Sequence, residues 1–372
     1  MRNTLRKIFY GVLSVLNFLM PKFKKVLVYA DPSLEGNSEA FFRYLITNTD
    51  ARVVCATKSH IEYPQKGRYL FFAPTLLKVA FHMMTCSVLI DSSLHSVKMK
   101  PTKKQLFLQL WHGSPLKYLS PSKSISQGDY YSKICYAAEI FKDSLQKNEF
   151  NAAPSKMLLA GGCHNDYLFH SSKKVDPEFG GKKIMWLPTY RHWGKVSHSR
   201  IDIPILNKEN IADLNQFLKE HNTKIYVKPH PLQSVSFEKI ISKELQNVVL
   251  LSNSDLFRRN MTLYEFLADT DALLTDYSSV FFDYLLIDRP IGFTIDDYED
   301  YLKYNGFTFD NPKELMPGMH LYNMDDMKKF VENLNAGEDE YAKKREQVNV
   351  LANYYKDGNN CQRAYELIKT YI

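Results

Sequence analysis

The 372-residue sequence lacks the features that mark several specialised classes of protein. Its five cysteines are odd in number, widely scattered and never spaced as Cys-x-x-Cys, which argues against a disulfide framework or a zinc site. A reducing cytoplasm therefore fits best. The chain has no internal repeat or low-complexity tract, and its 45% hydrophobic content argues against disorder. These absences leave an ordinary globular protein, long enough for two α/β domains.

The sequence also lacks an apolar run long enough to span a membrane. Its most apolar N-terminal segment, Ile8 to Met20, contains Gly11, Ser14 and Asn17 and is shorter than the roughly 20 residues of a spanning helix. Apolar residues recur there at helical spacing between basic flanks, so we expect residues 1–22 to form an amphipathic helix on an anionic membrane surface. A packed helix and a cleaved signal peptide are the alternatives, although no small-residue cleavage site follows. The apolar positions are Leu5, Ile8, Phe9, Val12, Leu13, Leu16, Leu19 and Met20, and the basic flanks are Arg2, Arg6, Lys7, Lys22, Lys24 and Lys25.

A net charge of +7 favours anionic partners such as nucleotides, phosphorylated polymers or acidic lipid headgroups. The basic residues are dispersed, and they do not cluster with aromatic residues in any recognised nucleic-acid-binding motif. We therefore expect no nucleic-acid partner. The 24 tyrosines and 23 phenylalanines indicate aromatic-lined clefts or a membrane-facing surface.

Beyond residue 22, short apolar runs alternate with helical or loop segments, a pattern typical of parallel sheets covered by helices on both faces. A polar stretch rich in Lys, Gly and Pro, residues 171–183, divides the runs into two series. The sequence therefore predicts an α/β protein with an N-terminal domain over residues 23–178 and a C-terminal domain over residues 179–372. The expected strands cover residues 26–29, 52–55, 87–90, 106–110, 133–136 and 157–159, then 184–187, 225–227, 248–250, 272–274 and 290–293.

Unusual polar residues follow four of these strands. Ligands collect at the carboxyl ends of strands in open parallel sheets, so we expect the four segments to face one cleft. The last segment leads into a helix, whose unpaired N–H groups and partial positive charge suit a phosphate; simple capping by Ser278 is the alternative. The segments are Trp111-His112-Gly113-Ser114-Pro115, Pro188-Thr189-Tyr190-Arg191, Lys228-Pro229-His230-Pro231 and Asp276-Tyr277-Ser278-Ser279.

Three residues in these segments suit acid–base and phosphate chemistry. His112 can act as a general base near neutral pH, and His230 is held in place by flanking prolines. Arg191 can pair with a phosphate through two N–H groups. Each residue also has a purely structural interpretation. His112 could be a histidine of the core, His230 could belong to a rigid turn, and Arg191 could be an exposed cation on a loop. The triplet Asp269-Thr270-Asp271 resembles that of metal-dependent glycosyltransferases, but it directly precedes a buried strand, and we predict no metal and no cofactor.

Together the motifs resemble those of the CDP-glycerol glycerophosphotransferase family, the bacterial enzymes that prime and polymerise teichoic acids and related capsular polymers. The resemblance extends over about residues 25 to 370, and the ordered motifs are specific as a set. They are Trp-His-Gly-x-Pro-x-Lys at 111–117, Pro-Thr-Tyr-Arg at 188–191, Lys-Pro-His-Pro at 228–231 and Thr-Asp-Tyr-Ser-Ser-x-x-x-Asp at 275–283, with C-terminal signatures at 305–310, 316–318 and 357–363.

The resemblance implies a GT-B glycosyltransferase-like architecture, in which two Rossmann-like domains face a central cleft and the C-terminal domain holds the donor nucleotide. It also implies a peripheral protein on the cytoplasmic face of the bacterial cell membrane. His112 is the implied base, and His230 and Lys228 are implied to stabilise the phosphates. The implied substrate-binding residues are Trp111, Gly113, Ser114, Pro115, His164, Pro188, Thr189, Arg191, Lys228, Pro229, Ser278, Ser279 and Asp283.

One segment departs from the family pattern. The family usually has Gly-x-Pro-Arg-Asn-Asp before the domain boundary, whereas Cys163 and His164 replace Pro-Arg within residues 161–166 of this chain. The arginine at the position of His164 is expected to help bind the donor. Either His164 replaces it as a weaker, pH-dependent cation, or the donor differs.

The expected reaction is attack by an acceptor hydroxyl on the β-phosphorus of CDP-glycerol, with release of CMP. Glycerol phosphate would pass to a lipid-linked glycan or polymer of the cell envelope, in teichoic acid or capsule synthesis. The alternatives are a ribitol-phosphate transferase, a GT-B transferase that uses a nucleotide sugar, and a non-catalytic scaffold of an envelope assembly complex.

Overall fold

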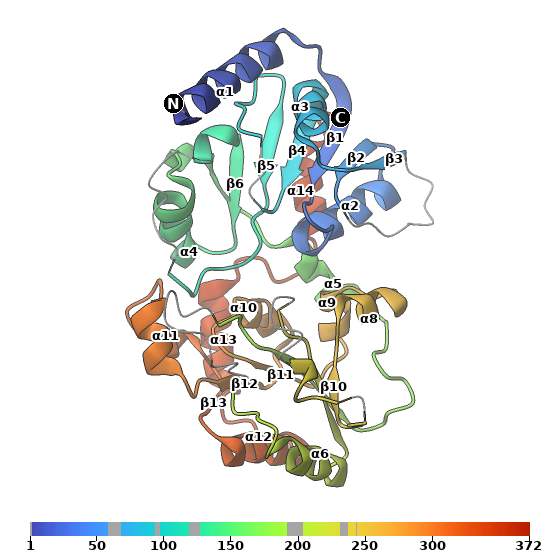
Figure 1. Cartoon of the computed structure of the whole chain (residues 1–372), viewed down its shortest axis with the longest axis vertical. Helices are drawn as coiled ribbons and strands as arrows, with labels where there is room; N and C mark the ends of the chain where they lie inside the picture. The colour runs from blue at the N-terminus through green and yellow to red at the C-terminus, as the bar shows by residue number, and fades with distance from the viewer. Residues whose placement is uncertain are drawn as a thin grey trace. The chain divides into compact units, whose positions relative to one another are not determined.

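The computed structural model of the protein describes residues 2–58, 68–93, 97–118, 127–191, 204–230, 237–242 and 244–372, with side chains from residue 9 onward. The chain forms two compact units (Figure 1). The N-terminal unit comprises Met1–Ser114, Ser120–Asp166 and Tyr354–Ile372, and the C-terminal unit comprises Pro115–Leu119 and Tyr167–Asn353. Pro231, which belongs to one predicted motif, lies outside the described residues.

The N-terminal unit is built on a seven-stranded parallel sheet with the order β3-β2-β1-β4-β5-β6-β7. Its central strands are rich in Val, Leu and Ile because both faces are buried; Val26 of β1 is fully buried and pairs with Val53 of β2 and Val88 of β4. The strands are β1 (Phe23–Tyr29), β2 (Arg52–Ala56), β3 (Tyr69–Phe72), β4 (Cys86–Asp91), β5 (Leu106–Gln109), β6 (Lys133–Tyr136) and β7 (Met157–Leu159), and the helices are α1 (Arg2–Leu19), α2 (Gly36–Asn48), α3 (Leu76–Thr85), α4 (Glu139–Asp143) and α14 (Asn360–Ile368).

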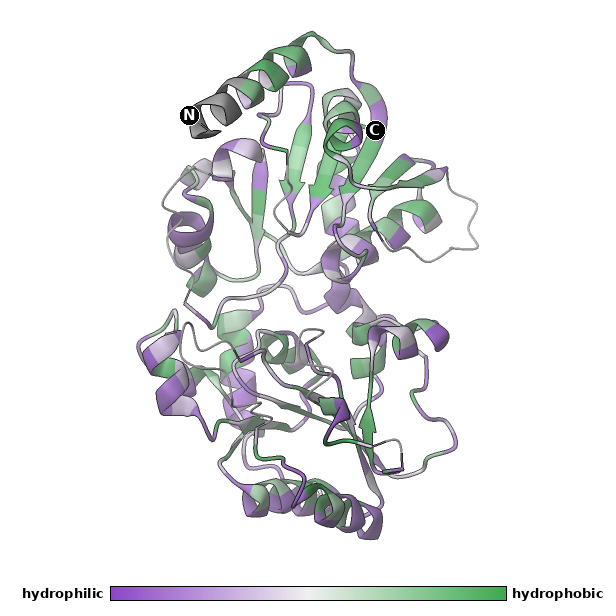
Figure 2. Ribbon diagram, in the orientation of Figure 1, coloured by the Kyte–Doolittle hydropathy of each residue, from purple (hydrophilic) through white to green (hydrophobic). Residues whose placement is uncertain are grey.

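The C-terminal unit contains a six-stranded parallel sheet with the order β10-β9-β8-β11-β12-β13. Trp186 of β8 is fully buried among apolar residues of the neighbouring strands and of α6 and α12, whose outer faces are hydrophilic (Figure 2). The strands are β8 (Lys182–Leu187), β9 (Thr223–Val227), β10 (Val248–Leu250), β11 (Ala272–Thr275), β12 (Ile291–Thr294) and β13 (Met319–Leu321), and the helices are α6 (Ile211–Glu220), α8 (Asn253–Arg258), α9 (Leu263–Leu267), α10 (Val280–Tyr284), α11 (Tyr298–Tyr304), α12 (Met324–Ala336) and α13 (Ala342–Ala352).

Each sheet reverses its strand order once. In the N-terminal unit the chain proceeds from β1 to β2 and β3 on one side and then crosses to β4 on the other; in the C-terminal unit β8, β9 and β10 are followed by a crossover to β11. Loops leave the two central strands in opposite directions at such a switch point, so a crevice opens at their carboxyl ends. The β1/β4 and β8/β11 ends are therefore the positions at which folds of this type place their ligands.

The predicted α/β architecture is confirmed, and all the expected strands form. Strands β3 and β13 were not predicted. Both are edge strands, and only four and three residues long respectively. The edge strands β7 and β10 are equally short and were predicted, so length does not account for the two omissions.

The division of the chain differs from the predicted boundary at residues 178 and 179. It falls inside α5 (Asp166–His170), and the last 19 residues, Tyr354–Ile372, return to the N-terminal unit. The Asp166 carboxylate holds them there because it accepts hydrogen bonds of 2.8 Å from the backbone N–H groups of Asn360 and Cys361 at the start of α14. A division read along the sequence does not reveal such a return.

The side of helix α1 that packs against the protein carries a buried polar residue. Its Asn17 is fully buried and donates hydrogen bonds to the Lys100 carbonyl at 2.9 Å and to Gln105 Oε1 at 2.8 Å, while Leu13 is 7% exposed. From residue 9 onward, the other large aliphatic side chains and both phenylalanines of the helix are exposed. No helix among the described residues is long and apolar enough to cross a membrane. The large exposed apolar residues of α1 are Phe9, Val12, Val15, Leu16, Phe18 and Leu19.

Candidate functional site

The turn after β5 holds Trp111 in a left-handed conformation. Its φ is +59°, which costs a non-glycine residue roughly 1–2 kcal/mol. Two buried amides impose this conformation: Gln109 Oε1 accepts the Trp111 N–H at 2.8 Å, and the Asn37 side chain donates to the Trp111 carbonyl at 2.8 Å. The indole packs edge-on against Phe150. The turn that carries His112 is therefore rigid.

The His112 imidazole lies at the surface of the N-terminal unit, beside the β1/β4 switch point. Its Nδ1 lies 3.1 Å from the Ser92 carbonyl oxygen, which can only accept, so Nδ1 carries a proton. Nε2 makes no hydrogen bond with a described residue and keeps its lone pair in the neutral ring. Burial lowers the His112 pKa, and the Ser92 hydrogen bond and the Asp91 charge partly oppose that shift. A neutral imidazole with an open Nε2 is a general base.

His164 lies close to His112 in the same unit. It is 4% exposed, and its proximity further lowers the His112 pKa. The Asn37 side-chain oxygen accepts the His164 backbone N–H at 3.1 Å, so Asn37 links the loop after β7 to the turn at Trp111. The structure thus brings together two histidines that are 52 positions apart in the sequence. Ser114 is buried and Gly113 partly exposed.

In the C-terminal unit, the ends of β8 and β11 meet at a buried carboxylate. Asp276 accepts the Thr189 N–H at 2.8 Å and also the Thr189 hydroxyl, and it pairs with Arg191 at 2.6 Å. The Arg191 guanidinium also pairs with Asp297 at 2.6 Å. Burial opposes the charge of Arg191, but Asp276 and Asp297 outweigh it and hold the Arg191 pKa above its usual range. Arg191 is therefore already bonded to two carboxylates, and its contact with a phosphate stays a prediction.

Aromatic rings surround this ion-pair network. The Arg191 guanidinium lies 5.2 Å from the ring centre of Tyr277 and 5.6 Å from that of Tyr301. The Tyr277 hydroxyl donates to Asp297 at 2.8 Å, and burial and that carboxylate raise the Tyr277 pKa. The Phe307 ring packs against Tyr277 at 5.4 Å. These contacts fix the loop that follows β11 without using its serines.

Ser278 and Ser279 remain open at the start of α10. Both are partly exposed, and neither hydroxyl bonds to a residue that the structure describes. The helix is only five residues long before it tightens at Leu285–Ile287. Asp283 is 7% exposed and accepts a hydrogen bond of 2.7 Å from the Tyr264 hydroxyl.

The loop after β9 lies beside the loop after β8. The exposed His230 ring is 5.3 Å from the Tyr190 ring, and Lys228 is partly exposed. The Lys228 N–H donates to the Trp186 carbonyl at 2.9 Å. Pro115, Pro188 and Pro229 are buried.

The sequence did not single out Asn37, Asp91, Gln109 or Asp297 as parts of these sites. Asn37 lies in the first turn of α2, Gln109 and Asp91 end strands, and each of these three is at most 3% exposed. A buried polar residue at a strand end next to a recognised motif is a signal that could have found Gln109 and Asp91. Nothing in the sequence around Asn37 points to Trp111, 74 residues away.

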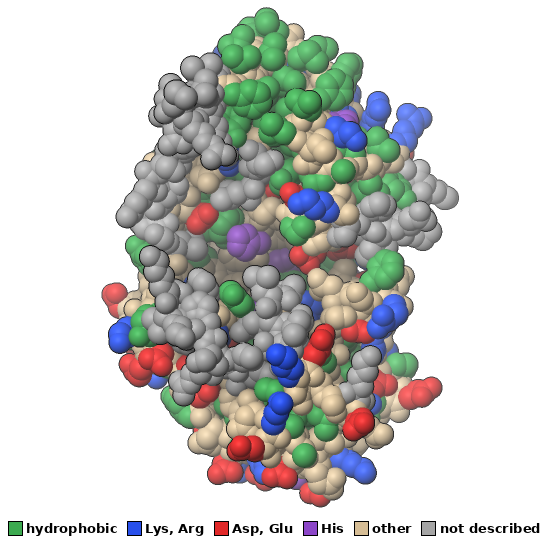
Figure 3. Space-filling model, viewed as in Figure 1, with side chains coloured by type: hydrophobic (Ala, Val, Ile, Leu, Met, Phe, Trp, Pro, Cys, Tyr) green, Lys and Arg blue, Asp and Glu red, His purple; other side chains and the backbone are tan. Residues whose placement is uncertain are grey.

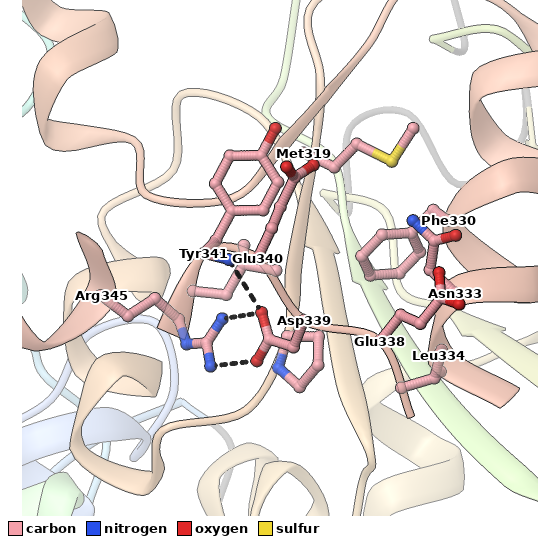
Figure 4. A pocket seen from close by; sticks show the side chains of 11 residues that line it. Met319, Phe330, Asn333, Leu334, Glu338, Asp339, Glu340, Tyr341 and Arg345 are labelled. Carbon is pink, nitrogen blue, oxygen red and sulfur yellow. Dashed lines mark hydrogen bonds and ion pairs between the residues drawn. The ribbon is translucent and has the colours of Figure 1, made fainter. Parts of the chain in front are cut away.

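Two other features lie apart from these sites. The Asp269 carboxylate of the acidic triplet bonds to Lys174 at 2.9 Å and to Lys183 at 2.6 Å. Figure 4 shows a small pocket between β12, β13, α12 and α13. In it, two N–H groups of the Arg345 guanidinium donate hydrogen bonds to the two oxygens of the Asp339 carboxylate. None of the predicted site residues lines that pocket.

Two Rossmann-like units, each with polar groups at its switch point, are the building blocks of the GT-B-like fold. Comparison with solved structures agrees: the wall teichoic acid polymerase TagF matches with a TM-score of 0.78 at 19% identity, covering 99% of this chain and 97% of that one.

The sequence comparisons identify the family. The model of the CDP-Glycerol:Poly(glycerophosphate) glycerophosphotransferase family matches residues 12–370, so the chain belongs to that family. The teichoic acid ribitol-phosphate primase of Bacillus spizizenii is 25% identical, covering 100% of this chain and 99% of its own. The teichoic acid glycerol-phosphate transferase of Staphylococcus aureus is also 25% identical, over 99% of each chain. The protein is thus a transferase of the family whose relatives build teichoic acid glycerol- and ribitol-phosphate polymers.

Proposed function

We propose that the protein transfers glycerol phosphate from CDP-glycerol to a hydroxyl group of a lipid-linked glycan or polymer of the cell envelope and releases CMP. The observation that carries this proposal is which ring nitrogen of His112 holds the proton. Its Nδ1 proton is held by the Ser92 carbonyl, so Nε2 is left to accept a proton at the surface of the N-terminal unit.

The proposed step balances as follows. The acceptor hydroxyl gives its proton to His112 Nε2 while its oxygen forms a bond to the β-phosphorus of CDP-glycerol. The bond between that phosphorus and the bridging oxygen breaks, and CMP leaves with the electron pair. The product is a phosphodiester that joins glycerol to the acceptor. His112 then loses the proton to solvent and is ready for another cycle.

Donor binding is supported by the polar groups that follow two strands of the C-terminal unit. The Ser278 and Ser279 hydroxyls, the partly exposed Lys228 and the exposed His230 follow β11 and β9, whose carboxyl ends lie on the same edge of one sheet. Cations and hydroxyl donors at this edge suit the two phosphates of a nucleotide donor. One solved structure of TagF was obtained from crystals soaked with CDPG, which supports a similar donor here.

CDP-ribitol is the second candidate donor. The ribitol-phosphate primase and the glycerol-phosphate transferase match this chain at the same 25% identity over nearly full length. The two donors differ only in the length of the polyol, and the extra carbons of ribitol extend away from the phosphates that the serines and cations would hold.

Membrane attachment is the second part of the proposal. The exposed apolar residues of α1 continue onto α3, where Leu77 is 78% exposed, and Figure 3 shows apolar side chains gathered over this end of the N-terminal unit. An apolar surface of this kind suits the boundary between lipid headgroups and acyl chains. Two of the basic residues that were expected to contact lipid headgroups, Lys22 and Lys25, form hydrogen bonds within the protein instead. Lys22 Nζ donates to the carbonyls of Met20 and Met84, and Lys25 Nζ donates to Thr85.

The reaction can be tested with purified protein, a lipid-linked disaccharide acceptor and three donors: CDP-glycerol, CDP-ribitol and a UDP-sugar. We expect CMP release with CDP-glycerol and a product heavier by one or more glycerol phosphate units in mass spectrometry. His112→Ala should lower turnover by about 10²-fold or more with little change in donor affinity. Release of UDP alone, or full activity of His112→Ala, would contradict the proposal.

The membrane surface can be tested with vesicles that contain anionic lipid. Phe18→Ser, at a side chain that is 78% exposed, should lower the fraction that sediments with vesicles and leave the melting temperature unchanged. Leu13→Ser is the matched control, since that side chain is buried against the protein and its loss should lower the melting temperature instead. Unchanged sedimentation of Phe18→Ser would assign membrane binding to another surface.

A further inference from the structure

The segment Pro115–Leu119 belongs to the C-terminal unit, although it directly follows the turn that carries His112. It is fixed there by backbone bonds to the Asn305–Asp310 signature. Lys117 forms an antiparallel bridge with Phe307, the Thr308 N–H donates to the Leu116 carbonyl at 2.9 Å, and the Thr308 hydroxyl donates to the Lys117 carbonyl at 2.7 Å. Two motifs about 190 residues apart thus form one short piece of sheet.

This piece of sheet lies beside the β8/β11 switch point. The Phe307 ring packs against Tyr277 at 5.4 Å and against Tyr301 at 5.5 Å, and Tyr277 directly follows Asp276. The Lys117 ammonium is close enough to interact electrostatically with Asp276 and with Arg191. The docked segment therefore brings a third charged side chain to the place where Thr189 and Asp276 meet.

None of the described residues bonds to the Lys117 ammonium group. Within the described residues its Nζ makes no hydrogen bond and no ion pair, whereas the Asp276 oxygens already accept from Thr189 and Arg191. Burial lowers the Lys117 pKa, with the Asp276 charge opposing and the Arg191 charge adding to that shift. A half-buried cation with three unused donors at a switch point matches an anionic oxygen of a ligand.

We propose that Lys117 binds the phosphate oxygens of the nucleotide diphosphate donor at the β8/β11 switch point. The inference rests on the proposed function for the identity of that donor. Negative charge develops on the phosphate of CMP as it leaves, and an ammonium group in a partly desolvated position stabilises that charge more than the ground state. The Trp-His-Gly-x-Pro-x-Lys motif would then supply the base on one unit and a phosphate cation on the other.

The test compares Lys117→Met, Lys117→Arg and the control Lys343→Met, which removes an exposed lysine of α13 in the same unit. Calorimetry with CDP-glycerol should show affinity at least tenfold weaker for Lys117→Met, a smaller loss for Lys117→Arg and no change for Lys343→Met. Cytidine, which has no phosphate, should bind all four proteins equally. A Lys117→Met protein that binds CDP-glycerol as tightly as the wild type would overturn the assignment.

Thermal unfolding of the ligand-free proteins separates this role from a structural one. An ammonium that is partly desolvated and has no bonded partner costs stability, so Lys117→Met should melt at or above the wild-type temperature. A lower melting temperature together with weaker cytidine binding would make Lys117 a structural residue and overturn the proposal.

A wild-type protein that fails to bind CDP-glycerol would refute the proposed donor but not the phosphate site. Inorganic pyrophosphate then becomes the probe. Weaker pyrophosphate binding by Lys117→Met would uphold Lys117 as a phosphate ligand, and equal binding would overturn it.

Discussion

Replacing Gln109 by leucine should uncouple the turn that holds His112 from the sheet beneath it. The Gln109 side chain is fully buried at the end of β5, and both ends of its amide are used. Oε1 accepts the Trp111 N–H at 2.8 Å, and Nε2 donates to the Ser93 carbonyl at 2.9 Å. Leucine has nearly the same size but can make neither bond.

The expected loss follows from these contacts. The buried Trp111 N–H and the partly buried Ser93 carbonyl lose their partner, at about 1–3 kcal/mol each. Trp111 can then relax from its φ of +59°, which recovers about 1–2 kcal/mol. The net loss in the free energy of unfolding should be about 2 kcal/mol. Relaxation of the turn displaces His112, and a shift near 1 Å is enough to lower kcat by about 10²-fold.

Gln105→Leu is the matched control because Gln105 lies just before the same strand, at its opposite end. Its amide is also buried and donates to the carbonyls of Met83 and Cys86 at 2.7 and 2.9 Å. Urea unfolding and steady-state kinetics on a soluble acceptor should show a loss of stability in both variants, but a fall in kcat only in Gln109→Leu. The loss should be larger in Gln105→Leu, because Gln105 Oε1 also accepts from Asn17 and from the Thr102 N–H. Equal kcat in the two variants would refute the reasoning that Gln109 positions His112.

Three further predictions follow from the charged and polar groups. The value of kcat/KM should rise with pH through an apparent pKa below the ordinary histidine value of about 6.5, because burial lowers the His112 pKa and only the neutral ring accepts a proton. Asp91→Asn should move this rise to lower pH, and an unmoved profile would remove Asp91 from the electrostatics of the site. Ser278→Ala combined with Ser279→Ala should weaken CDP-glycerol binding about tenfold in calorimetry, and unaltered affinity would show that the hydroxyls do not contact the donor. Asp276→Asn should lower the free energy of unfolding by about 3–5 kcal/mol, since buried Arg191 loses one of its two counter-charges; a loss below about 1 kcal/mol would contradict the buried network.

The sequence alone was sufficient for every strand except β3 and β13, and for the motifs. Strands such as β4 and β11 are buried on both faces, so each is a continuous apolar run that can be recognised without its neighbours. The residues that follow a strand lie at its carboxyl end in every parallel sheet, so the positions of His112 and Ser278 in the chain were enough to place them at the carboxyl edges of the two sheets. Family membership follows from the same ordered motifs.

Only the tertiary structure determined which of these residues meet. The contact of Thr189 with Asp276 requires β8 and β11 to be neighbours, and strand order depends on long-range packing that local patterns do not encode. The same is true of Asn37, which bonds to a carbonyl 74 residues away, and of Lys117, which docks against Phe307. Helix α14 returns to the N-terminal unit, where the Asp166 carboxylate accepts its first N–H groups and Tyr365 packs against Tyr44 of α2. Strands and short motifs can be predicted from a sequence because they depend on residues that are neighbours in the chain. The partners of a buried charge depend on the tertiary fold, which brings distant residues together.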